Sequence, residues 1–221
     1  MDTKRELLSI YRKLDAFFGD LKWWPADSPF EVIVGAVLTQ NTAWRNVEKA
    51  IHELKTRNLL SPEELLITEN ELLADAIRSS GFYRLKARRL KAFVRFLYER
   101  YKGSLEEMFA EDLWQLRGKL LQIDGIGPET ADSILLYAGC KPIFVVDAYT
   151  RRILLRHGFI NEKASYTDIQ MLFMKRLPRD VYLYNQYHAL LVNTGKLFCA
   201  KNPRCRSCPL YTVDMSIKGD L

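Results

Sequence analysis

Residues 120–131 read LLQIDGIGPETA and join two stretches whose apolar side chains recur at helical spacing. Gly125 and Gly127 flank a single apolar residue, and Pro128 suits the first turn of the second helix. A Gly-x-Gly turn lets the backbone approach another molecule closely, and amide N–H groups beside a helix N-terminus favour a phosphate oxygen. A tight turn with a purely structural role explains the same residues, so the pattern alone leaves both interpretations open.

The rest of the chain also reads as helices. Apolar residues recur at helical spacing from Arg5 to Phe18, and Ser28-Pro29 is typical of a capped helix start. Further helical patterns run near 42–56, 61–66, 70–79, 84–101, 104–116, 127–138, 147–157, 165–176 and 179–195. Only 142–146 looks extended, and it is short enough to be a connector. We therefore expect an all-α protein.

The composition is that of a globular protein. The chain has 221 residues, 48% of them hydrophobic and 27% charged, which excludes a disordered or fibrous chain. The longest uncharged apolar stretch, 32–38, is far too short to cross a bilayer, and the first residues form no signal-peptide core. We expect a soluble, cytoplasmic protein of one large or two small domains.

The basic residues are unevenly distributed in this chain of net charge +6. Between Arg84 and Lys102 nearly all charged residues are basic, whereas the stretch between Arg57 and Arg78 contains only acidic ones. A surface polarised in this way suits a polyanion on one side. A solvated helix face has the same pattern, so charge makes a nucleic acid possible and no more.

Residues 143–152, IFVVDAYTRR, place Asp147 at the start of a helical pattern after an apolar approach. This arrangement is typical of a helix N-cap, in which the carboxylate accepts a backbone N–H. The functional alternative is a carboxylate held at a cleft beside the preceding Gly-x-Gly turn.

Three of the four cysteines, Cys199, Cys205 and Cys208, fall within ten residues of one another. Disulfides are not expected in a cytosolic chain, where clustered thiolates usually hold zinc or an iron–sulfur cluster. Asp214 lies six residues beyond Cys208, where a fourth ligand could lie. Surface cysteines without a metal are the alternative.

In this order, these three segments resemble the helix-hairpin-helix DNA glycosylases of the endonuclease III superfamily, over nearly the whole chain. Asp147 matches the catalytic aspartate of that family, which follows the hairpin at similar spacing. Residues 38–42, LTQNT, resemble the loop that pushes a polar residue into DNA, and residues 80–86, SGFYRLK, resemble the second wedge loop.

The resemblance implies two helical domains with a DNA-binding cleft between them. Residues 27–138 would form a six-helix barrel domain that contains the helix-hairpin-helix motif. Residues 1–26 with 139–221 would form the second domain, which carries the catalytic Asp147 and a C-terminal iron–sulfur loop.

Two departures from endonuclease III indicate the branch. Glu129 replaces the lyase lysine, so no amine stands ready to form a Schiff base, and an intact abasic site should result. The base pocket of the 3-methyladenine glycosylase branch resembles a second set of residues, namely Trp23, Trp24, Pro25, Trp44 and Glu129. Ordinary core filling is the alternative for the tryptophans.

The chemistry that this branch implies begins with flipping the target nucleotide out of the duplex. Gln40 and Phe82 would fill the vacated space. The residues expected to contact the DNA backbone are Gly125, Gly127, Lys86, Arg88 and Arg89. Stacked indoles would favour the positive charge of 3-methyladenine. Asp147 would stabilise the oxocarbenium-like sugar or deprotonate the attacking water.

The resemblance further implies a 4Fe–4S cluster held by Cys199, Cys205, Cys208 and Asp214, labile because a carboxylate replaces the fourth cysteine; zinc is the lesser possibility. The expected partner is damaged double-stranded DNA, bound by a monomer associated with the nucleoid and not with a membrane. Two functions remain as alternatives: a glycosylase for oxidised or mispaired bases, and a non-catalytic helix-hairpin-helix protein that binds DNA.

Overall fold

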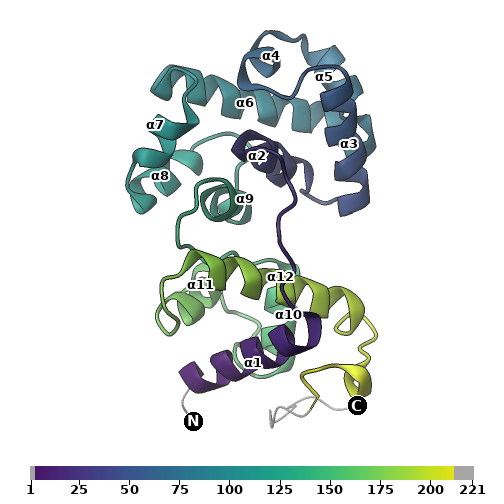
Figure 1. Ribbon diagram of the computed structural model, residues 1–221, viewed down its shortest axis with the longest axis vertical. Helices are drawn as coiled ribbons and strands as arrows, with labels where there is room; N and C mark the ends of the chain where they lie inside the picture. Colours follow the sequence, from purple (N-terminus) through teal and green to yellow (C-terminus); the bar gives the residue numbers. More distant parts are fainter. Residues whose placement is uncertain (1–2, 212–221) are drawn as a thin grey trace. The chain divides into compact units, whose positions relative to one another are not determined.

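A computed structural model of the chain describes residues 3–211, and these residues form helices and no strand (Figure 1). The all-α expectation is confirmed. Within the described part of the chain, no helix is both long enough and apolar enough to span a membrane.

The chain divides into two compact units. One unit consists of residues 24–141, and the other of residues up to 23 together with those from 142 onward. The domain expected at 27–138 corresponds to the unit of residues 24–141. The two ranges differ by three residues at each end (27 against 24, 138 against 141).

The unit of residues 24–141 is built around a buried central helix. Its helices are α2 (Pro29–Leu38), α3 (Trp44–Thr56), α4 (Pro62–Ile67), α5 (Asn70–Ala76), α6 (Tyr83–Tyr101), α7 (Leu105–Ala110), α8 (Leu113–Leu120) and α9 (Pro128–Ser133), with a 3₁₀ turn η1 (Arg78–Ser80) and a π-helical turn η2 (Ile134–Ala138). The Ser28 hydroxyl accepts the Glu31 N–H at the start of α2, and every residue of α2 from Phe30 to Leu38 is buried. Helices α3, α6 and α9 and the turn η2 pack around it.

Two predicted helices of this unit differ from the observed ones. The stretch 104–116 is two helices, because the Asp112 carboxylate accepts the N–H groups of Trp114 and Gln115 and so starts α8 as a new helix. The stretch 127–138 begins as α9 and continues into the π-helical turn η2. Helical periodicity in the sequence shows neither the cap nor the wider turn.

The other unit is built around α12. Its helices are α1 (Thr3–Phe18), α10 (Ala148–Arg156), α11 (Tyr166–Met174) and α12 (Val181–Leu197), with a 3₁₀ turn η3 (Cys205–Ser207). Helices α1 and α10 contact α12 directly. In the core, the rings of Phe144 and Phe173 stack with centroids 3.8 Å apart, and the ring edges of Tyr187 meet both. Residues 142–147 lead into α10 without regular structure, as the connector reading expects.

Candidate functional site

The hairpin between α8 and α9 uses its two glycines differently. Gly125 has φ +80°, a left-handed conformation that favours glycine, and a Cβ there would lie 2.3–2.5 Å from the Arg89 side chain. Gly127 has extended backbone as the N-cap of α9, and a Cβ there would meet only open space. Gly125 is therefore required by the turn itself, whereas Gly127 leaves an open approach to the first turn of α9, where Glu129 is exposed.

A buried ion pair fixes the two helices of the hairpin to each other. Arg117 on α8 donates through Nε to Asp132 Oδ1 at 2.6 Å and through Nη2 to Oδ2 at 3.1 Å. The Asp132 side chain on α9 is fully buried, and that of Arg117 is 16% exposed. This bidentate contact joins α8 to α9 across the turn.

Gln40, the predicted wedge residue, is docked on the hairpin. Its Nε2 donates to Gly125 O and to Thr130 Oγ1, both at 2.9 Å, and its Oε1 accepts a hydrogen bond from Arg89. Insertion of Gln40 into DNA would therefore require these hydrogen bonds to break.

Phe82, the second predicted wedge, stands out from the surface. Its side chain is 70% exposed, and its backbone has φ +46°, which an aromatic residue rarely adopts. It precedes α6 and follows Gly81, which also has a positive φ. The turn thus holds an apolar ring in solvent at a cost in backbone strain.

Lys86 does not lie where a phosphate contact requires it. Its side chain is buried, and Nζ donates to Leu38 O at 2.8 Å and to Ser80 O at 2.6 Å. Burial, and secondly the nearby Arg89, lower the pKa of Lys86 to about 8. The expected contact between this ammonium and DNA is corrected accordingly: the amine bonds to the protein's own backbone.

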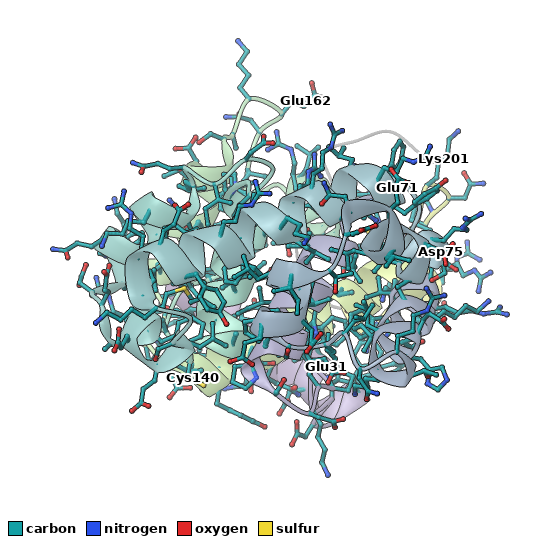
Figure 2. The ribbon with its side chains drawn as sticks, turned by 90° about the horizontal axis from the view of Figure 1, so that it is seen from above. Glu31, Glu71, Asp75, Cys140, Glu162 and Lys201 are labelled. Atoms are coloured by element: carbon teal, nitrogen blue, oxygen red, sulfur yellow. The ribbon has the colours of Figure 1, made fainter. Side chains whose placement is uncertain are left out.

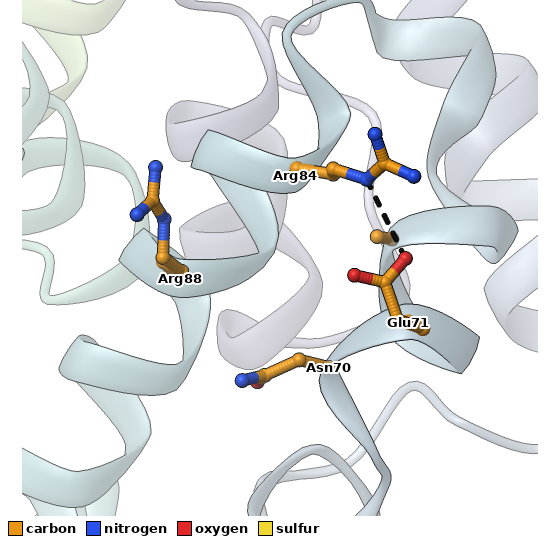
Figure 3. Close-up of a pocket in the computed structure, with 5 residues that line it drawn as sticks. Asn70, Glu71, Arg84 and Arg88 are labelled. Atoms are coloured by element: carbon orange, nitrogen blue, oxygen red, sulfur yellow. Dashed lines mark hydrogen bonds and ion pairs between the residues drawn. The ribbon is translucent and has the colours of Figure 1, made fainter.

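Two carboxylates of the acidic stretch beside α6 form ion pairs with arginines. Asp75 accepts from Arg57 at 3.1 Å and from Arg78 at 2.8 Å, and Glu71 lies 3.4 Å from Arg84 (Figures 2 and 3). Hydrogen bonds from Arg57 and Arg78 lower the pKa of Asp75, and burial opposes this effect only in part.

A surface pocket of about 260 Å³ lies between α5 and α6, and it is separate from the predicted site residues except Arg88. Figure 3 labels Asn70, Glu71, Arg84 and Arg88 among the residues that line it. Its two arginines and one carboxylate give it mixed charge.

Two aromatic side chains of the same unit lie against the Trp24 ring. The Trp24 ring meets Trp44 edge-on, with centroids 5.1 Å apart at 85°, and lies tilted on Tyr137 at 5.0 Å and 34°. A Cβ at Gly35 would lie 3.2 Å from Trp24 Nε1, so the glycine makes room for the indole on α2. All three rings are half-buried. We call Trp24, Trp44 and Tyr137 the aromatic cluster.

Sequence reasoning missed Tyr137, which lies against Trp24. Tyr137 belongs to the π-helical turn η2, whose wider spacing places its ring where a 3.6-residue pattern does not. Trp23 belongs to the other unit, where Lys196 Nζ lies 5.6 Å from its ring centroid. Pro25, predicted with them, is exposed.

Asp147 is the N-cap of α10. Its Oδ1 accepts the Thr150 N–H at 2.7 Å, and its Oδ2 lies 3.8 Å from His188 Nε2 on α12. The side chains of Asp147 and His188 are 11% and 6% exposed. Burial lowers the pKa of His188, Asp147 raises it and Lys196 lowers it, with a net decrease. Nothing in the sequence pattern singled out this histidine, because it lies on the buried face of an apolar helix.

The three clustered thiols lie near the end of the described chain. Cys199 is buried, Cys208 half-buried and Cys205 exposed, and none forms a disulfide. Burial raises the pKa of Cys208, and a hydrogen bond with the Leu210 backbone partly opposes this effect. The Cys199 Sγ accepts a hydrogen bond from Arg156 Nη1 at 3.2 Å. The fourth cysteine, Cys140, is exposed in the other unit (Figure 2).

Thiolates are the usual ligands of an iron–sulfur cluster, so these three cysteines have the chemistry of such a site. Asp214, the predicted fourth ligand, lies outside the described residues. Among residues 3–211, no three His, Cys, Asp or Glu side chains are arranged as a metal site.

Comparison with known proteins identifies the family. Residues 34–179 match the model of a family described as "HhH-GPD superfamily base excision DNA repair protein". A protein of Methanocaldococcus jannaschii, whose name proposes a DNA repair glycosylase, is 49% identical over 97% of this chain and 99% of its own length.

Two solved structures share the fold and a substantial part of the sequence. The 3-methyladenine DNA glycosylase MagIII of H. pylori, bound to 1,N6-ethenoadenine, has a TM-score of 0.76 and 29% identity, covering 89% of this chain and 98% of its own. An endonuclease III trapped covalently on DNA has a TM-score of 0.81 and 26% identity, covering 95% of this chain and 94% of its own. The chain therefore belongs to the HhH-GPD superfamily and is a base excision repair DNA glycosylase.

Proposed function

We propose that this glycosylase acts on alkylated purines of the 3-methyladenine type. The observation that carries the proposal is the aromatic cluster of Trp24, Trp44 and Tyr137. 3-Methyladenine carries a positive charge that adenine lacks, and an aromatic face attracts a cation by about 0.5–2 kcal/mol, more where water is excluded. The similarity to MagIII, a 3-methyladenine DNA glycosylase, supports the same substrate class.

The proposed mechanism needs little acid catalysis, because alkylation already makes the base a good leaving group. Phe82 would occupy the space that the flipped nucleotide leaves. The hairpin backbone at Gly125 and Gly127 would bind phosphate, which positions the enzyme without reading the base. Asp147 Oδ2, which the N-cap does not use, would stabilise positive charge on the sugar or orient the attacking water.

We further propose that the enzyme is monofunctional. Glu129 stands where endonuclease III carries its lyase lysine, and a carboxylate cannot form a Schiff base with the sugar. Borohydride added to a reaction on abasic DNA should trap no covalent adduct. Efficient trapping that one lysine substitution abolishes would contradict this.

The substrate proposal is tested by the release of labelled bases from methylated duplex DNA. Trp44→Ala should lower the excision of 3-methyladenine at least tenfold while binding to an abasic-site analogue changes little. Trp114→Ala is the matched control, because Trp114 is an exposed tryptophan of the same unit outside the cluster. Release of oxidised or mispaired bases in place of 3-methyladenine would overturn the proposal in favour of the alternative glycosylase.

We also propose an iron–sulfur cluster held by Cys199, Cys205, Cys208 and Asp214. Such a cluster would have a structural role and would secure the loop that carries the basic residues Lys201, Arg204 and Arg206. A carboxylate is a harder ligand than a thiolate, so one iron should be labile. Anaerobically purified protein should be brown and contain iron with inorganic sulfide. Colourless protein without either after reconstitution, or stoichiometric zinc, would contradict the proposal.

A further inference from the structure

Helix α6 contains a buried lysine whose amine connects two loops. The Lys86 side chain is 1% exposed, and Nζ donates to Leu38 O at 2.8 Å and to Ser80 O at 2.6 Å. Leu38 is the last residue of α2, directly before the loop that carries Gln40, and Ser80 ends η1, directly before Gly81 and Phe82. One nitrogen thus holds the backbone at the start of both predicted wedge loops.

These carbonyls need a partner because they lie at helix ends. The last carbonyls of a helix have no intrahelical donor, and a buried carbonyl without a hydrogen bond costs about 1–3 kcal/mol. An apolar side chain of similar length would fill the same space and avoid the cost of burying an ammonium. Lys86 therefore adds what an apolar residue cannot: donors to both carbonyls at once.

We propose that Lys86 is a positioning residue that keeps the Gln40 loop and the Phe82 loop in one fixed arrangement, so that both wedges meet the DNA together. The inference rests on the proposed wedge roles of Gln40 and Phe82. Gln40 is also bonded to the hairpin at Gly125 O. In the free protein, Gln40 thus joins its loop to the hairpin, and Lys86 joins that loop to the Phe82 loop. Insertion of Gln40 into DNA would break the first connection and leave the second.

The same helix offers a matched control. Lys91, 7% exposed, donates through Nζ to Leu66 O at 2.9 Å and to Thr68 O, and so satisfies carbonyls at the end of α4. Its chemistry is that of Lys86, but it contacts neither wedge loop. If buried lysines on α6 matter only for folding, substitutions of Lys86 and Lys91 should have the same consequences.

The test uses a duplex that contains an abasic-site analogue with 2-aminopurine opposite it, whose fluorescence rises when the base is unstacked. At saturating protein, Lys86→Met should reduce this rise at least twofold, while Lys91→Met retains it. The salt dependence of binding should be unchanged in Lys86→Met, because no phosphate contact is lost; loss of one contact would lower the slope by about 0.9. A full fluorescence rise in Lys86→Met, an equal loss in Lys91→Met or a lowered slope would each overturn the proposal.

A folding defect is separated by a second pair of variants. Lys86→Gln and Lys91→Gln keep N–H donors without the charge, and thermal unfolding is measured for all four proteins. If both Lys86 variants fail to fold while both Lys91 variants fold, Lys86 is a determinant of folding and the proposal is overturned.

The test does not depend on the lesion that the enzyme removes, because the abasic-site duplex contains no base to excise. An enzyme that releases no 3-methyladenine but shows the expected difference between Lys86→Met and Lys91→Met would overturn the proposed substrate and support this inference. An absent fluorescence rise in the unmodified enzyme would contradict the wedge roles on which the inference rests, and overturn it.

Discussion

Asp147 accepts the backbone N–H of Thr150 through Oδ1 at 2.7 Å, and this bond starts helix α10 without using Oδ2. The capping and the catalytic interpretations of Asp147 are therefore compatible, because each needs one oxygen. The second oxygen lies 3.8 Å from His188 Nε2, and the pKa of that histidine is lowered chiefly by burial. A histidine with a lowered pKa is predominantly neutral at neutral pH, so this ring adds no positive charge beside Asp147.

The two roles of Asp147 can be separated by substitution. Asn and Ser are also good N-caps, so Asp147→Asn and Asp147→Ser should change the free energy of unfolding by less than about 1 kcal/mol. Both remove the charge and should lower the single-turnover excision rate at least about 10²-fold, with DNA affinity kept or improved. Near-normal turnover in either variant would leave Asp147 as a helix cap only.

The exposed ring of Phe82 predicts opposite effects on stability and activity. Because Phe82 has φ +46° and is 70% exposed, Phe82→Gly should remove backbone strain and raise the free energy of unfolding by up to about 1 kcal/mol. Excision should fall at least tenfold, since the apolar wedge is lost. Chemical denaturation and single-turnover kinetics measure the two effects.

A control for Phe82→Gly lies at the other end of α6. Lys102 has φ +53° as the C-cap of that helix, so Lys102→Gly should relieve similar strain and leave excision unchanged. A similar loss of excision in both variants would show that the effect arises from the backbone of α6 and not from the ring.

Local patterns in the sequence predicted the elements whose chemistry is local. The turn at Gly125 and the helix starts at Ser28 and Asp147 were readable, because a left-handed residue and an N-cap leave their signature within a few neighbours. The fold class followed from helical periodicity in the same way.

Contacts between distant residues were not readable. Lys86 lies in a basic stretch, and the sequence gives no sign that its amine bonds to Leu38 O and Ser80 O. Tyr137 joins Trp24 through a π-helical turn, and His188 meets Asp147 across two packed helices. Each of these depends on tertiary packing, which a residue pattern within one element does not specify.

The buried pair of Arg117 and Asp132 predicts a large and specific loss of stability. Asp132→Asn leaves the Arg117 guanidinium, only 16% exposed, without its charged partner, and should lower the free energy of unfolding by about 3 kcal/mol. Glu53→Gln breaks the exposed pair with Arg57 and should cost less than about 1 kcal/mol. Urea denaturation of the unmodified protein, Asp132→Asn and Glu53→Gln measures the two losses in unfolding free energy.

A double variant distinguishes loss of the charge pair from loss of packing. Arg117→Met with Asp132→Leu removes both charges and should recover part of the stability that Asp132→Asn loses, because no unpaired charge remains buried. A double variant less stable than Asp132→Asn would show that the geometry of the pair, and not an orphaned charge, determines the loss.

The lowered pKa of Lys86 predicts how its contribution to stability depends on pH. Burial, with Arg89, lowers the pKa of the folded protein to about 8, whereas an unfolded lysine titrates near its ordinary value of about 10.4. Between these two values the unfolded chain binds more protons, so the free energy of unfolding rises with pH, by up to about 1.4 kcal/mol per pH unit. Below the folded pKa, the cost of burying the charged amine is present in full.

The difference in unfolding free energy between the unmodified protein and Lys86→Met should therefore shift in favour of lysine by about 2 kcal/mol from about pH 7.5 to about pH 10. All other titrating groups are common to the two proteins and cancel in the difference. A difference that is flat across this range, measured by urea denaturation at each pH, would show that Lys86 keeps an ordinary pKa despite its burial.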